Sequence, residues 1–178
     1  MKHDIAQMKP DATTPHSFAN RLLVLIALVA SLSAAPALCV AADASLPAAI
    51  QHYNLGPEKV ALKGYDPVGY YTKNQAFKGR RELGAWHQGV TYYFATEQNR
   101  KLFTDSPGKY LPAYGGWCAT AMAKGEKVDI DPNNFKLTNG RWFLFYKGLF
   151  GDALRDWEKD EATLTAKADA NWRRITGE

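Results

Sequence analysis

The alternation of apolar and polar positions predicts two β-hairpins in this chain. Apolar side chains recur with the two-residue period of a strand on each side of Gln88-Gly89, a dipeptide that favours a turn. Asn139-Gly140 separates a second pair of apolar segments, and this dipeptide is the strongest short hairpin signal. The predicted strands are residues 60–62, 83–87, 90–94, 127–130, 135–137 and 141–146.

Helical signals lie between and after these strands. Thr96 is a good N-cap, and Ser106-Pro107-Gly108 ends the helix that it begins. Near the C-terminus, Leu164, Ala168 and Trp172 recur at helical spacing and form an apolar stripe. This stripe belongs to a predicted helix at residues 162–174, and further helices are predicted at residues 45–54, 117–124 and 149–159. Residues 65–68 are expected to form a turn and residues 110–114 an irregular crossing.

These elements together predict one α+β domain. We expect a small antiparallel sheet of hairpins packed with short helices. The domain spans residues 58–174 and is preceded by a lead-in segment at residues 43–57. No internal repeat and no low-complexity tract interrupts it.

The first 42 residues have the pattern of a signal peptide. Residues 22–35 are a run of fourteen apolar or small residues, which is shorter than the roughly 20 needed to span a membrane. Small-residue cleavage patterns follow at residues 35–37 and 40–42, and we expect cleavage after Ala42. The protein is then exported, to the periplasm or outside the cell, and keeps no membrane span. A retained N-terminal anchor and a lipoprotein processed at Cys39 are the alternatives.

The charge distribution argues against nucleic acid as a partner. Lys and Arg number 22 and Asp and Glu 18, for a net charge of +4. Adjacent arginines occur only at Arg80-Arg81 and Arg173-Arg174, and neither pair extends into a basic stripe. A protein partner is left open, because the sequence does not identify one.

Cysteine use points to a single residue of interest. The chain has two cysteines, Cys39 and Cys118, and cleavage after Ala42 leaves Cys118 alone. Exported proteins usually pair their cysteines, so a lone cysteine is either buried and inert or serves chemistry. An intramolecular disulfide is excluded in that mature form.

Four stretches of the chain resemble one protein family. They are "LKGYDPVGYY", "GVTYYFATEQNRKLFTDSPGKYLPAYGGWCA", "DIDP" and "KADANW", which together extend from about Val60 to Trp172. These stretches resemble the exported YHS-domain proteins, a family that includes selenoproteins. The wider YHS group is associated with metal handling, so the resemblance implies a small single-domain fold and a link to metals, but no firm enzymatic activity.

The sequence departs from the metal-associated YHS pattern at its cysteines. Gly69, Ala95 and Asn99 stand where those proteins carry cysteine. Metal binding by the usual cysteines of that group is therefore not available. The exported subgroup instead carries a "GGxCA" stretch, which here is residues 115–119.

Cys118 and its neighbours are the candidate site. A thiol at the start of a short helix would be favoured as thiolate, and Tyr114, Gly115, Gly116 and Trp117 could form a pocket beside it. The alternative is a small buried hydrophobic residue, because free cysteine is among the most buried residue types.

His87 is the candidate partner of that thiol. A Cys118–His87 pair could bind copper or zinc or could activate the thiol, although one cysteine and one histidine are not a metal motif by spacing. The alternative for His87 is an exposed residue at a turn.

Three functions follow from these residues. The first is a non-enzymatic exported domain that binds a metal ion or a metal-bearing partner near Cys118. The second is a thiol-based redox protein that uses Cys118, and the third is a structural or interaction domain without a ligand. The motifs of hydrolases, dehydrogenases and nucleotide-binding enzymes are absent, so we do not expect an enzyme.

Overall fold

The computed structural model describes residues 48–149 and 151–177. The predicted signal peptide, residues 1–42, and the start of the lead-in segment, residues 43–47, lie outside the described residues. The described residues all belong to one compact unit. None of their helices combines the length and the apolar character that a membrane crossing requires.

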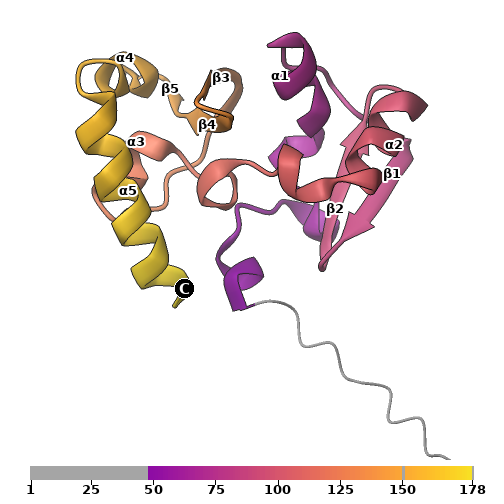
Figure 1. The fold of residues 1–178 in the computed structure, drawn as a ribbon, viewed down its shortest axis with the longest axis horizontal. Helices are drawn as coiled ribbons and strands as arrows, with labels where there is room; N and C mark the ends of the chain where they lie inside the picture. The colour runs from indigo at the N-terminus through magenta and orange to yellow at the C-terminus, as the bar shows by residue number, and fades with distance from the viewer. Residues whose placement is uncertain (1–47, 150, 178) are drawn as a thin grey trace, which may run out of the picture. The chain divides into compact units, whose positions relative to one another are not determined.

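Helices and short antiparallel hairpins make up the structure, which confirms the α+β class (Figure 1). The six strands form three separate two-stranded sheets in the described residues, instead of the single small sheet that the sequence suggests. The strands are β1 (Arg80–His87), β2 (Val90–Phe94), β3 (Asp131–Thr138), β4 (Arg141–Phe145), β5 (Lys147–Gly148) and β6 (Gly151–Asp152). The α-helices are α1 (Pro67–Lys73), α2 (Glu97–Asp105), α3 (Ala119–Met122), α4 (Ala153–Trp157) and α5 (Glu161–Thr176), and the 3₁₀ helices are η1 (Ala48–His52), η2 (Pro57–Lys59), η3 (Leu62–Gly64), η4 (Pro107–Tyr110) and η5 (Ala113–Gly116).

Both predicted hairpins are confirmed. Gln88 and Gly89 have φ values of 47° and 88°, and Asn139 and Gly140 have 49° and 73°. Positive φ at both central residues is what a tight hairpin turn with the twist of the flanking strands requires. Each hairpin also has a register shift at the far end of its ladder.

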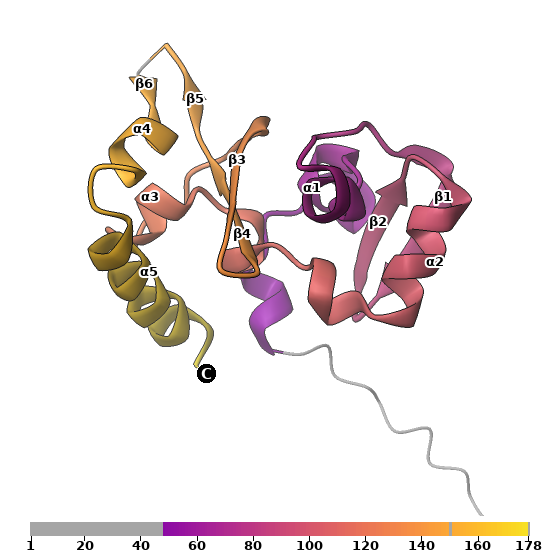
Figure 2. The ribbon, with the colours of Figure 1, turned by 45° about the horizontal axis from the view of Figure 1, so that its top comes forward.

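Helices pack beside each hairpin. α1 and α2 contact the β1–β2 hairpin, and α3 and α4 contact β3 or β4. α5 packs along α3, and Figure 2 shows α3, α4 and α5 together beside the β3–β4 hairpin. The single turn of α3 is therefore enclosed by α4, α5 and β4.

The helix that begins after Thr96 forms as predicted. α2 starts at Glu97, and the Thr96 hydroxyl accepts a hydrogen bond from the Asn99 amide at 3.0 Å. The helix ends at Asp105, immediately before Ser106. The predicted helix at residues 117–124 is a single turn, α3.

The turn expected at residues 65–68 is wrong, because a helix begins there. Asp66 caps α1 by accepting a hydrogen bond from the Val68 amide at 2.9 Å. Pro67 occupies the first helical position, where its missing N–H costs nothing. Val68 and Tyr70 are fully buried, so packing continues the helix past the turn signal.

Two further predictions are wrong at their boundaries. Residues 127–130 form no strand, and pairing begins at Asp131 opposite Phe145. The strand does not break at Asp131-Pro132 as expected, because Pro132 lies within the register shift between Asp131 and Phe135, where the ladder is irregular. The helix predicted at residues 149–159 begins only at Ala153, because Lys147 pairs with Asp152 in the β5–β6 hairpin.

Aromatic side chains dominate the core. Trp157 of α4 lies at the centre of one cluster, with its ring centroid 5.3 Å from that of Phe143 and 5.5 Å from that of Phe145. Tyr70 of α1 stacks on Trp142 of β4, with the ring centroids 4.5 Å apart. The buried residues around the two hairpins therefore form one continuous core. The largest fully buried side chains are Trp142, Trp157, Tyr70, Tyr92, Phe94, Phe103, Phe143, Phe145, Met122, Leu144, Val68 and Val90.

Candidate functional site: the Cys118 cavity

Cys118 lies at the N-cap position of α3 and is almost completely buried. The residue is 1% exposed, and its thiol is free. The Cys118 amide donates to the Val128 carbonyl at 3.0 Å, and Cys118 bridges to Leu144 of β4. Because α3 has only four residues, its dipole is small, and the electrostatic argument for a thiolate is weaker than the sequence suggests.

A small cavity nevertheless reaches Cys118. Its volume is about 170 Å³, enough for a few water molecules, since one water occupies about 30 Å³ in the liquid. Its polar rim comes from the end of α3 and from β6 and α4. The lining residues are Cys118, Thr120, Ala121, Lys124, Glu126, Val128, Tyr146, Gly151, Asp152, Ala153 and Asp156.

The acidic residues of this rim differ in how they are held. Asp152 accepts hydrogen bonds from the Asn134 side-chain amide at 2.9 Å and from the Leu154 backbone amide at 3.2 Å. The hydrogen bond from Asn134 is the largest cause that lowers the pKa of Asp152 below its ordinary value. Asp156 is paired with Lys159 at 2.6 Å, which lowers the pKa of Asp156. Both carboxylates are therefore ionised at neutral pH.

His87 is not in contact with Cys118. It is the last residue of β1, and its ring lies edge-on to Phe103 at 5.9 Å. Across residues 48–149 and 151–177, no hydrogen bond or ring contact joins His87 to Cys118. β1 and α3 also lie at opposite sides of both ribbon views (Figures 1 and 2).

The stretch from Tyr114 to Trp117 is packed against other segments. Tyr114, Gly115 and Gly116 are buried and have φ values of 55°, 57° and 86°. A Cβ on Gly115 would lie 2.6 Å from Tyr53 and 2.9 Å from Trp172, so side chains fill the space beside it.

Residues of the lead-in segment cover this stretch and form hydrogen bonds with it. The backbone amide of Asn54 donates a hydrogen bond to the Gly115 carbonyl at 2.9 Å, and the Trp117 indole N–H donates to the His52 carbonyl at 2.6 Å. The open space near Cys118 therefore lies on the side of α4 and β6, not beside Gly115 and Gly116.

The described residues contain no group of three or more His, Cys, Asp or Glu side chains that could hold a metal ion. A metal at Cys118 would therefore need ligands from water, from a small molecule or from a partner in addition to the thiolate.

Ala95 and Asn99, two of the three positions at which the resemblance would lead one to expect cysteine, donate hydrogen bonds to Asp66. This carboxylate is fully buried and accepts hydrogen bonds from the Ala95 amide at 2.8 Å and the Asn99 side chain at 2.7 Å. At the third position, Gly69, an added Cβ would lie 2.5 Å from Phe77. Asp66 is thus a hydrogen-bonded structural centre that ties α1 to the start of α2.

Sequence reasoning missed the acidic rim of the Cys118 cavity. Asp152 precedes an apolar segment, so its role as the N-cap of α4 has a sequence signal. Its position beside Cys118 has none, because the two residues approach only when α4 packs on α3.

No protein-family model, curated protein or solved structure matches this chain.

Proposed function

We propose that this protein is an exported, non-enzymatic domain of the YHS type that binds a copper or zinc ion, or a metal-bearing partner, at the Cys118 cavity. The export rests on the signal pattern of residues 1–42, and the family on the stretches between Val60 and Trp172. The observation that carries the site is that Cys118, whose thiol is free, is one of the residues lining a cavity that also has three carboxylate residues in its lining.

The chemistry of this wall suits a thiophilic cation better than an anion. Glu126, Asp152 and Asp156 supply carboxylate oxygens, and Lys124 is the one lysine among the lining residues. Asp152 also lies 3.6 Å from the Lys147 ammonium, and Asp156 pairs with Lys159 at 2.6 Å. Thiolate binds copper and zinc strongly, and carboxylate oxygens complete many zinc sites. Since one protein thiol cannot saturate either ion, the site fits a cation that arrives with ligands of its own.

Metal titration of the full chain tests the proposal. We expect one Cu(I) or Zn(II) equivalent to bind, and Cys118→Ser to weaken the affinity at least about 100-fold, because even outer-shell changes cost 10- to 100-fold. His87→Ala is the matched control, and its affinity should equal that of the wild type because His87 does not contact Cys118. Equal affinity of Cys118→Ser and the wild type would contradict the proposal.

A second candidate function is supported by the size of the cavity. A space of about 170 Å³ admits hydrogen peroxide but not the disulfide of a protein, which must approach the sulfur directly. In this alternative, the Cys118 thiolate attacks peroxide, gains one oxygen as sulfenate and releases water. Trapping of sulfenate by dimedone in the wild type, without metal binding, would favour it over the first proposal. If the protein is inert in both experiments, a structural or interaction domain without a ligand remains.

A further inference from the structure

The β1–β2 hairpin has one covered edge and one uncovered edge. On the β2 side, the Thr91 carbonyl accepts a hydrogen bond from the Ala61 amide at 3.0 Å, so it points away from β1. Trp86 lies opposite Thr91 in the antiparallel ladder, and Gly84 lies opposite Tyr93. Because such pairs alternate along the ladder, the backbone groups of Trp86 and Gly84 point away from β2, toward the outer edge of β1.

This outer edge of β1 has no strand beside it. Across residues 48–149 and 151–177, β1 pairs only with β2, and no loop makes a backbone hydrogen bond to Gly84 or Trp86 on the other side. An open space of about 480 Å³ lies between Ala85 and α2. The outward N–H and C=O groups of residues 84–86 are therefore accessible to another strand.

Residues 84–86 also lack the features that usually keep an edge strand from pairing. Proteins protect such edges with charged side chains, proline or bulges. This stretch has no charged residue and no proline, and it pairs regularly with β2, because the register shift lies before Gly84. Trp86 is 71% exposed, and tryptophan is the residue type most often found at the energetic centre of protein interfaces.

From these features we infer that two copies of this chain associate through residues 84–86 of β1, which pair antiparallel about a two-fold axis. Gly84 of each copy exchanges backbone hydrogen bonds with Trp86 of the other copy, and Ala85 lies at the axis. Only this register uses every outward backbone group of residues 84–86 in both copies. The inference does not depend on the function proposed for Cys118.

The side chains fit this pairing. Trp86 and Gly84 are two residues apart, so they share the face of the hairpin opposite α2. Each indole then lies over the partner's Gly84, where no side chain blocks it, and beside the partner's Tyr93, which is opposite Gly84 and only half-buried. The pairing thus covers an exposed tryptophan with an aromatic neighbour and a glycine.

The charges of β1 favour the antiparallel direction. The charged residues Arg80, Arg81 and Glu82 all lie at the start of the strand, and the turn at its end, Gln88-Gly89, is uncharged. Antiparallel pairing places the charged start of each copy beside the uncharged end of the other. Parallel pairing would bring the arginines of the two copies together, which costs free energy.

Sedimentation equilibrium of the full chain tests the inference. We expect a reversible monomer–dimer equilibrium with a Kd of about 0.1 mM, because so short a pairing buries less area than a stable interface. At about 5 μM the chain is then monomeric, so unfolding measured at that concentration reports on the monomer. A chain that stays monomeric up to about 1 mM would overturn the inference.

Two variants locate the association. Trp86→Lys adds a charge to the edge and should weaken dimerisation at least about tenfold, without unfolding the monomer because Trp86 is exposed. Leu149→Lys is the matched control, since Leu149 is also a fully exposed apolar residue but belongs to the β5–β6 turn, and its Kd should equal that of the wild type. An unchanged Kd in Trp86→Lys, or an equal loss in Leu149→Lys, would place the association elsewhere and refute the inference.

Amide hydrogen exchange followed by NMR distinguishes strand pairing from contact through the indole alone. Exchange at Gly84 and Trp86 should be roughly threefold slower at about 1 mM than at about 50 μM, because dimerisation gives their amides acceptors. The His87 amide, which points toward β2, should exchange at the same rate at both concentrations. Concentration-independent exchange at Gly84 and Trp86 in a chain that dimerises would overturn the proposed pairing.

Discussion

The two long hairpins differ in how many of their faces are covered. In β2, Val90, Tyr92 and Phe94 are buried, and the residues between them are half-buried. In β4, all four residues from 142 to 145 are at most 1% exposed. β2 therefore shows the alternation of a strand with one covered face, and β4 the continuous burial of a strand covered on both.

The covering elements explain this difference. Trp157 packs on Phe143 and Phe145, which share one face of β4. On the other face, Tyr70 stacks on Trp142. At the edge of β4, Cys118 pairs with Leu144 through a single parallel bridge.

In β2, by contrast, one face carries the core. Phe103 of α2 lies against Tyr92 at 4.8 Å and against Phe94 at 5.1 Å. On the opposite face of the β1–β2 hairpin, Trp86 is 71% exposed. The comparison teaches that Cys118 is buried because it pairs with the edge of a strand that is covered on both faces, so its burial is a consequence of packing and not by itself a sign of inertness.

The largest expected effect is the difference in stability between two variants that each remove one aromatic side chain, Phe145 from the β3–β4 hairpin and Trp86 from the β1–β2 hairpin. Phe145→Ala should lower the free energy of unfolding by about 3–5 kcal/mol, because it leaves a cavity beside Trp157 in the doubly covered strand. Trp86→Ala should change it by less than about 0.5 kcal/mol, because the side chain is exposed. Urea denaturation measures both, and similar losses would refute the contrast between the hairpins.

The next prediction compares glycines in the two short 3₁₀ helices η5 and η4. Gly115 has φ of 57°, and a Cβ there would meet Tyr53 and Trp172, so Gly115→Ala should destabilise by about 2 kcal/mol or more. A Cβ on Gly108 would meet nothing within 4 Å, so Gly108→Ala should cost less than about 0.5 kcal/mol. Thermal unfolding of the two variants measures the difference, and an unaffected Gly115→Ala would show that the lead-in segment does not pack on η5.

The smallest expected effect concerns the arginine pair of each hairpin. Burial alone would raise the pKa of Asp169, but hydrogen bonds from Arg141 and Tyr114 lower it below 3.8. Because the folded-state pKa is lowered, the pair stabilises the protein above pH 3.8, and this contribution is lost as the pH falls below that value. Asp169→Asn should therefore cost about 0.5–1 kcal/mol at neutral pH, and this cost should shrink as the pH is lowered into the acid range.

The Arg81–Glu58 pair of the β1–β2 hairpin is the control for this effect. Its side chains are 69% and 59% exposed, so Glu58→Gln should leave the pH dependence of unfolding unchanged. Urea denaturation at neutral and acid pH compares the two variants. A penalty for Asp169→Asn that persists in acid would contradict the assigned pKa direction.

Local signals allowed part of the fold to be predicted. Asn139-Gly140, Gln88-Gly89 and the Thr96 cap act within a few residues, and each formed as expected. Asp66-Pro67 has the pattern of a turn, but the same residues also begin helices, and only the burial of Val68 and Tyr70 distinguishes the two outcomes. In the same way, the glycines at 148 and 151 allow a hairpin where apolar periodicity suggests a helix.

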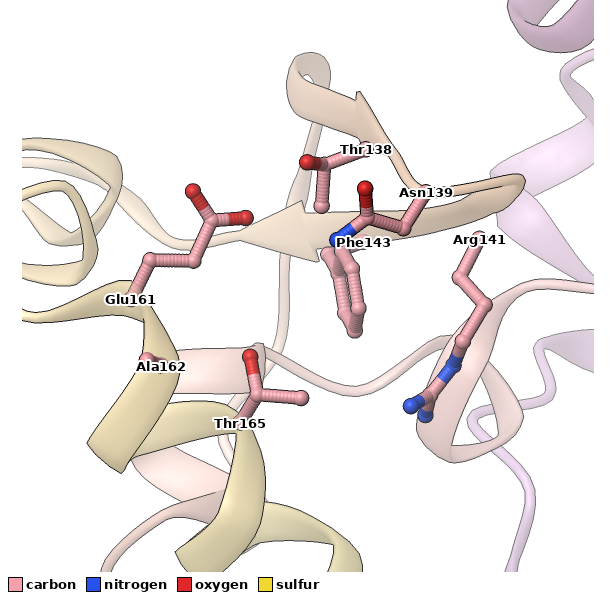
Figure 3. Close-up of a pocket in the computed structure, with 7 residues that line it drawn as sticks. All are labelled: Thr138, Asn139, Arg141, Phe143, Glu161, Ala162 and Thr165. Atoms are coloured by element: carbon pink, nitrogen blue, oxygen red, sulfur yellow. The ribbon is translucent and has the colours of Figure 1, made fainter.

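The candidate site could be predicted only as single residues. The sequence draws attention to Cys118, but it does not connect this thiol with Asp152 and Asp156, which belong to a later segment of the chain. It also offers no reason to connect Glu161 with Asn139, which line the same cavity between α5 and the β3–β4 hairpin (Figure 3).

The sequence by itself determined the α+β class, the two hairpin turns and the cap of α2. These features depend on backbone preferences and short-range hydrogen bonds, which neighbouring residues set. The tertiary structure alone decided which faces of the strands are covered and which side of Cys118 opens into a cavity. Those properties depend on contacts between segments far apart in the chain, where packing and desolvation outweigh local preference.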